Sequence, residues 1–157
     1  MKNNIALLSI SFLLFINFTY SQTKEETQAW ISEKINYYSY SDDIKIFYNY
    51  TMSFDESNMI IKSNCRTIFS GFDSTSDLSY VVPIKDLHKI RFENKANNVW
   101  LYLKTKSNSI KINGEMKNQV EILLENSFLE NDMRNRMDKA FTNLIKLYGG
   151  SVGEEKF

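Results

Sequence analysis

An apolar stripe with helical spacing near the C-terminus is the feature that most constrains this 157-residue chain. The stripe repeats at steps of four and three residues and consists of Leu129, Met133, Met137, Ala140, Leu144 and Leu147. Such a stripe indicates an amphipathic helix with one face against a core. Gly149 and Gly150 supply a left-handed stop, and Lys146 suits the negative end of the helix dipole. A helix of this kind needs a surface to cover, so the preceding residues must form one.

The middle of the chain has a period of two, which indicates strands. Apolar and polar residues alternate from Ile44 to Phe54, and only Phe47 interrupts the polar set. The polar run 70–77 is expected to be a loop. Residues 119–124 fit either a strand or the start of a helix, and we favour the strand. About seven strands are therefore expected, at 44–54, 59–69, 80–84, 87–93, 99–106, 109–112 and 119–124.

A second helix is expected before the strands, at residues 23–38. Thr23 and Glu26 have the spacing of a capping box, in which the two side chains satisfy each other's backbone N–H groups. The positions that form one apolar face of this helix are Trp30, Ile31, Ile35 and Tyr38. The helix is therefore expected to pack on the same core as the C-terminal one.

The order of helix, antiparallel strands and long C-terminal helix predicts an α+β domain. Sequential strands with short turns favour a bent sheet or open barrel, which the last helix closes. This layout resembles the pleckstrin-homology superfold with an extra helix in front. A helix-grip fold, with a sheet wrapped around the long helix, is the alternative. We expect one domain at residues 22–150 and a frayed tail at 151–157.

The first 21 residues have the layout of a secretory signal peptide. Lys2 precedes an apolar run from Ile5 to Phe18, which is shorter than the roughly 20 residues that span a bilayer. Small residues then suit cleavage between Ser21 and Gln22. The mature chain is therefore expected in the periplasm or outside the cell, without a membrane anchor.

A second resemblance rests on patterns spread along the mature chain. The matching segments are Thr23 to Trp30, Pro83-Ile84-Lys85-Asp86-Leu87, Lys139-Ala140-Phe141, Leu144-Ile145, Leu147 and Gly149-Gly150. Together they look like small exported proteins of unknown function from Bacteroidetes bacteria. The resemblance implies a periplasmic or secreted bacterial protein, and it implies no activity.

Charge and cysteine content exclude several classes of function. The chain has 19 basic and 19 acidic side chains, so it lacks the basic excess of a nucleic-acid-binding protein. Cys65 is the single cysteine and has no partner for a disulfide within the chain, so we expect a buried thiol. The chain is expected to be a monomer.

Catalytic chemistry has little support in the sequence. His88 is the single histidine, and it alternates with Ile90 and Phe92, which predicts a buried or half-buried structural role. One histidine and one cysteine are too few for a zinc site. We therefore expect no catalytic residue, no metal and no cofactor, and an enzyme of hydrolase type is the less favoured alternative.

A binding or interaction module is the function that the sequence favours. The acidic turn Asp55 to Asn58 would repel a phosphate group. Tyr80, Val81 and Val82 are instead expected to form a free strand edge that accepts a protein or peptide partner by strand addition. The alternative is a carrier of a small apolar ligand, suggested by the aromatic residues Phe47, Tyr48, Tyr50, Phe54, Phe69, Tyr80, Phe92, Trp100 and Tyr102.

Overall fold

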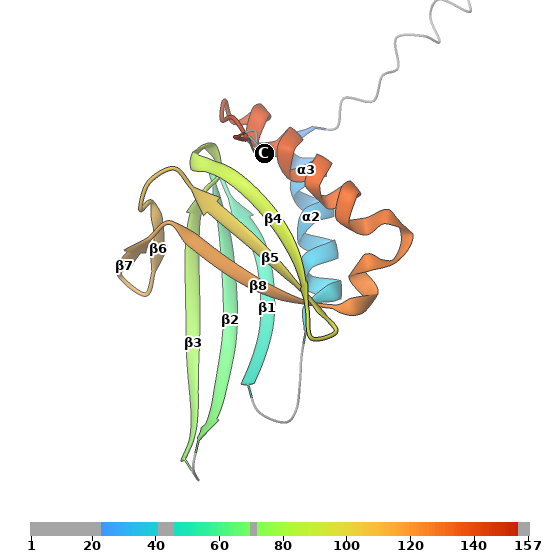
Figure 1. The fold of residues 1–157 in the computed structure, drawn as a ribbon. Helices are drawn as coiled ribbons and strands as arrows, with labels where there is room; N and C mark the ends of the chain where they lie inside the picture. The colour runs from blue at the N-terminus through green and yellow to red at the C-terminus, as the bar shows by residue number, and fades with distance from the viewer. Residues whose placement is uncertain (1–22, 41–45, 70–71, 154–157) are drawn as a thin grey trace, which may run out of the picture.

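Two antiparallel sheets and two main helices make up the part of the chain that the computed structural model describes, residues 23–40, 46–69 and 72–153 (Figure 1). The strands are β1 (Ile46–Asp55), β2 (Asn58–Phe69), β3 (Phe72–Pro83), β4 (Leu87–Lys95), β5 (Asn98–Thr105), β6 (Ile110–Ile112), β7 (Glu115–Lys117) and β8 (Gln119–Glu125). The helices are α2 (Lys24–Tyr38), η1 (Ile84–Asp86), η2 (Asn126–Asp132) and α3 (Met133–Leu147). The predicted α+β class, with a helix at each end of a run of antiparallel strands, is confirmed.

The strands divide into a five-stranded sheet of order β1-β2-β3-β6-β7 and a three-stranded sheet of order β4-β5-β8. Two-residue turns join β1 to β2, β4 to β5 and β6 to β7; the last of these turns is Asn113-Gly114, where both residues have positive φ (44° and 98°). Asn-Gly is the pair that favours such hairpin turns, because asparagine tolerates and glycine readily adopts a positive φ. This turn creates β7, a three-residue exposed strand that the sequence did not predict.

Both helices bury an apolar face against the sheets and against each other. The fully buried side chains include Ile31 and Ile35 of α2 and Phe141, Leu144 and Ile145 of α3. Burial of one such side chain stabilises the fold by roughly 1.5–3 kcal/mol. The capping box predicted at Thr23 and Glu26 is present, with both hydrogen bonds formed.

The segment that follows α2 joins the two sheets. The Tyr40 N–H donates to the Leu123 carbonyl of β8 at 3.1 Å. On its other side, the Tyr50 N–H of β1 donates to the Ser39 hydroxyl oxygen at 2.7 Å. Residues 39 and 40 therefore lie between an edge of each sheet and connect them.

The expected loop at residues 70–77 is wrong for residues 72–77, which form the first half of β3. These residues pair with β2, and the Asn64 amide donates to the Asp77 carboxylate at 2.8 Å. Thr75, Ser76 and Asp77 are all exposed, and the sequence of this stretch shows no apolar alternation. Pairing with the preceding strand β2 formed it, and the alternation of apolar and polar residues gave no sign of it.

The C-terminal helix begins later than its stripe suggests. Asn131 and Asp132 have left-handed φ values of 54° and 57°, and regular helix starts at Met133. Leu129 is therefore 37% exposed, whereas Phe128 is fully buried. The Phe128 ring packs 5.5 Å from the rings of Phe92 and of Tyr38, measured between centroids. The prediction that Leu129 lies in the core is therefore wrong, and the preceding residue, Phe128, lies there instead.

The chain after α3 folds back onto the domain. Gly149 adopts the predicted left-handed conformation, with φ of 75°. We expected fraying from residue 151, but the Gly153 N–H donates to the His88 carbonyl at 2.7 Å. Residues 151–153 therefore lie against β4, and residues 154–157 are outside the described part.

Candidate binding site

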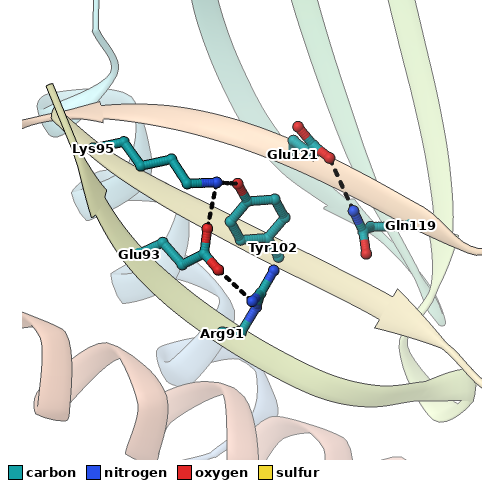
Figure 2. A network of polar contacts seen from close by, with 6 residues as sticks. All are labelled: Arg91, Glu93, Lys95, Tyr102, Gln119 and Glu121. Carbon is teal, nitrogen blue, oxygen red and sulfur yellow. Dashed lines mark hydrogen bonds and ion pairs between the residues drawn. The ribbon is translucent and has the colours of Figure 1, made fainter.

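The outward side of the three-stranded sheet gathers polar and aromatic side chains from all three strands. Arg91, Tyr102 and Glu121 are in register across β4, β5 and β8. Side chains alternate between the two sides of a strand, so the next residues along belong to the opposite side. The residues of that next row are Phe92, Leu101 and Ile122, and all three are buried in the core. We call the side that carries Arg91, Tyr102 and Glu121 the outer face; Figure 2 shows its polar contacts.

Tyr102 is at the centre of the outer face and is only 7% exposed, because cations cover its ring. The Arg91 guanidinium lies 4.5 Å from the ring centroid, and the Lys95 ammonium lies 5.4 Å from it. Both distances fall within the range of cation–π attraction. The Lys95 ammonium also donates to the Tyr102 hydroxyl at 3.0 Å. Trp100, two residues along β5, stacks on Tyr102 with ring centroids 6.5 Å apart.

Glu93 connects the two cations. Its carboxylate forms ion pairs with Arg91 and, at 2.5 Å, with Lys95 (Figure 2). The hydrogen bond from Lys95 is the largest of the effects that lower the pKa of Glu93, and the positive charge of Arg91 adds to it. In return, hydrogen bonds to Glu93 and Tyr102 raise the pKa of Lys95. The network is therefore charged at neutral pH and holds the Tyr102 ring in place.

A hollow of about 110 Å³ opens beside this network. Its lining contains three cationic side chains, one phenol and one amide, and no carboxylate: Lys89, Arg91, Lys104, Tyr102 and Gln119. The nearby carboxylate of Glu121 accepts a hydrogen bond from the Gln119 amide at 2.9 Å. The hollow is thus a small positively charged depression with an aromatic wall.

Two larger hollows within the described residues have a different character. One, of about 430 Å³, lies on β1, β2 and β3 and brings opposite charges together, Lys62 and Asp77. The other, of about 340 Å³, lies between α2 and α3, where Arg136 is 5.5 Å from the centre of the Trp30 ring and Lys139 is a neighbour. The second of these hollows is also lined by cationic side chains.

The free strand edge expected at Tyr80, Val81 and Val82 is wrong. Tyr80 and Val81 pair with β2 on one side and with β6 on the other, so their backbone groups already have strand partners. The Val82 side chain is fully buried. The short strand β6 pairs with β3 although β4 and β5 lie between them in the sequence. No local sequence pattern predicts this pairing.

His88 is half-buried, as expected, and interrupts β4. The pairing with β5 slips between Leu87 and Lys89, which makes His88 part of a β-bulge. Gly153 lies directly against its imidazole ring, where an added Cβ would be 2.0 Å from Cε1. Among the described residues, no group of three or more histidine, cysteine, aspartate or glutamate side chains forms a metal-binding arrangement.

Several sequence predictions fall outside what the structure describes. The cleavage site Ser21–Gln22 and the whole expected signal peptide belong to residues 1–22, and the side chain of Cys65 is also outside. Of the aromatic residues considered for a ligand cavity, Tyr50 and Phe92 are buried in the core, and Phe54 and Tyr80 pack against it. Within residues 23–153, apart from the gaps, no helix has the length and apolar character needed to cross a membrane.

Comparisons with known proteins identify no relative. No family model, no curated protein and no solved structure matches the chain. The fold class stated above therefore rests on the geometry of this chain alone.

Proposed function

We propose that this chain is an exported binding module without catalytic activity, and that its partner, a protein or peptide, binds on the outer face of β4, β5 and β8. The observation that carries the proposal is the Arg91–Glu93–Lys95–Tyr102 network, which fixes charged and aromatic groups on the solvent side of a sheet. Tyrosine, tryptophan and arginine are the residues most enriched at the energetic centres of protein interfaces.

Rigidity supports the same proposal. The outer face stands on three hydrogen-bonded strands, and its reverse side is buried core. A site built on such elements loses little conformational entropy when a partner binds. We also propose that the domain is of the pleckstrin-homology type, because antiparallel strands are followed by a C-terminal helix. The position of the site on the three-stranded sheet does not depend on it.

Export is proposed from the pattern of residues 2–21, in which one lysine precedes a short apolar run. The test is N-terminal sequencing of the protein recovered from periplasm and culture medium. We expect a chain that begins at Gln22. A full-length chain in the cytoplasmic fraction would contradict the proposal.

Site-specific crosslinking in the producing cells tests the binding face. A photoreactive amino acid replaces the exposed residue Glu121 on the outer face, and the control places it at the exposed residue Lys62 on the five-stranded sheet. We expect one discrete crosslinked species from position 121 and none from position 62. The same yield from both positions, or no product from position 121, would overturn the proposed face.

A further inference from the structure

Like charges face each other across β4 and β5 at one end of the outer face. Lys89 and Lys104 are direct cross-strand partners in the register. Directly opposed like charges destabilise a sheet, so neutral or opposite pairs are favoured at such positions. Arg91 lies next along β4 and adds a third cation to the same hollow. Three cationic side chains therefore border one hollow.

The carboxylates near the hollow already have partners. Glu93 is paired with Arg91 and Lys95, and Glu121 accepts from Gln119. Lys104, in contrast, has no hydrogen bond or ion pair with any residue in the described part of the chain. Its ammonium group is exposed and borders the hollow. The charge of Lys104 is therefore available to an anion from outside.

The size of the hollow restricts what enters it. Pockets for whole small-molecule ligands measure about 300–1,000 Å³, whereas this one measures about 110 Å³. It therefore suits the end of one side chain rather than an entire metabolite. A carboxylate is planar, and an arginine fork beside a lysine matches it in shape and charge.

We propose that the hollow binds a carboxylate side chain of an acidic segment in the partner, with Lys104, Arg91 and Lys89 as the groups that recognise it. This inference rests on the proposed function, because it assigns chemistry to the same face. Gln119 supplies an amide at the rim, and Tyr102 borders the hollow beneath the Arg91 guanidinium.

The test uses residues 22–157 and a blocked hexaglutamate peptide, with binding measured by NMR titration at low salt. We expect the amide signals of Lys104, Tyr102 and Gln119 to shift. Lys104→Glu should weaken binding at least about tenfold, since it removes a charge-assisted hydrogen bond and adds a repelling carboxylate. Lys104→Gln should weaken it less. Raising the salt concentration should weaken binding of the unchanged protein, because exposed charges are screened.

Lys139→Glu is the matched control, since it makes the same charge change in the cationic hollow between α2 and α3. We expect its affinity to stay within about twofold of the unchanged protein, because that hollow is not the proposed site. Unchanged melting temperatures establish that each variant is folded. A peptide whose binding depends on Lys139 and not on Lys104 would overturn the assignment.

Two further outcomes separate this inference from the proposed function. Phosphatidylglycerol vesicles are tested in parallel; vesicle binding that depends on Lys104, without peptide binding, would show a lipid phosphate as the occupant and overturn the inference. No peptide binding, together with a crosslink from position 121, would also overturn it and leave the binding face standing. Loss of that crosslink would instead count against the proposed function.

Discussion

The side-chain amide of Asn36, near the end of α2, pairs with both backbone groups of Met52 in β1. The Asn36 Oδ1 accepts from the Met52 N–H at 2.6 Å, and its Nδ2 donates to the Met52 carbonyl at 3.4 Å. The amide thus imitates one residue of a neighbouring strand. Because β1 is the edge of its sheet, this pairing satisfies backbone groups that would otherwise be open to another chain.

Replacing Asn36 with alanine should therefore destabilise the domain. The part-buried N–H and carbonyl of Met52 would lose their partner, at a cost of about 1–3 kcal/mol. Urea denaturation followed by circular dichroism measures the change. Asn94→Ala is the control, since Asn94 is exposed and its side chain makes no hydrogen bond with described residues, and its effect should stay within about 0.5 kcal/mol. Equal losses for both variants would show that the strand-like pairing contributes nothing.

Tyr148 links three segments through its hydroxyl and ring. The Gln28 amide donates to the hydroxyl at 2.8 Å, and the hydroxyl donates to the Glu56 carbonyl in the β1–β2 turn. The Lys24 ammonium lies 4.4 Å from the ring centroid. Tyr148→Phe keeps the ring and removes the hydrogen bonds, so it should cost about 0.5–1.5 kcal/mol in thermal unfolding. Tyr37→Phe, at a tyrosine that is 75% exposed, should leave the melting temperature unchanged.

Lys95→Met should raise the pKa of Glu93 toward its ordinary range, because the hydrogen bond from Lys95 is the main cause of the lowered value. A carbon-detected NMR titration of the carboxyl group measures this. Lys117→Met is the matched control. It removes the hydrogen bond that most lowers the pKa of Glu115, and it should leave Glu93 unchanged.

The ion pair between Glu93 and Lys95 predicts that the stability of the fold depends on pH. The pKa of Glu93 is lower in the folded state, so its ionised form stabilises the fold above the unfolded pKa. That contribution is lost as the pH falls through the folded value. The difference in unfolding free energy between the unchanged protein and Lys95→Met should therefore be largest near neutral pH and shrink below about pH 4. A difference that grows in acid would contradict the ion pair.

Gly153→Ala should release the tail from β4. An alanine Cβ would overlap the His88 ring, and the tail is held there by the hydrogen bond from the Gly153 N–H to the His88 carbonyl. Hydrogen exchange measured by NMR should show loss of protection at amide 153. The amide of Gly150, bonded to the Ile145 carbonyl, serves as the internal control and should keep its protection. Retained protection at position 153 would show that the ring moves aside instead.

The sequence by itself determined the elements whose cause is local. The capping residues Thr23 and Glu26, the left-handed stop at Gly149 and the stripe from Met133 to Leu144 act within a few residues of chain, and each was predicted where it occurs. The alternation in β4 and β5 also placed Lys89 and Arg91 on one side of their strand, and Trp100 and Tyr102 on one side of theirs. Lys95, in contrast, lies beyond the strand expected at 87–93, and β4 extends to include it.

Only the tertiary structure decided what those members form together. Strand register set Lys89 opposite Lys104 and placed Arg91 over the Tyr102 ring, and the pairing of β5 with the more distant β8 brought Gln119 beside Lys104. Pairing with the preceding strand β2 made residues 72–77 a strand, and pairing at longer range covered Tyr80 and Val81 with β6. Local periodicity reports which side of a strand faces a core. Local periodicity does not show which strands pair with each other, and the pairing of β4, β5 and β8 is what forms the proposed binding face.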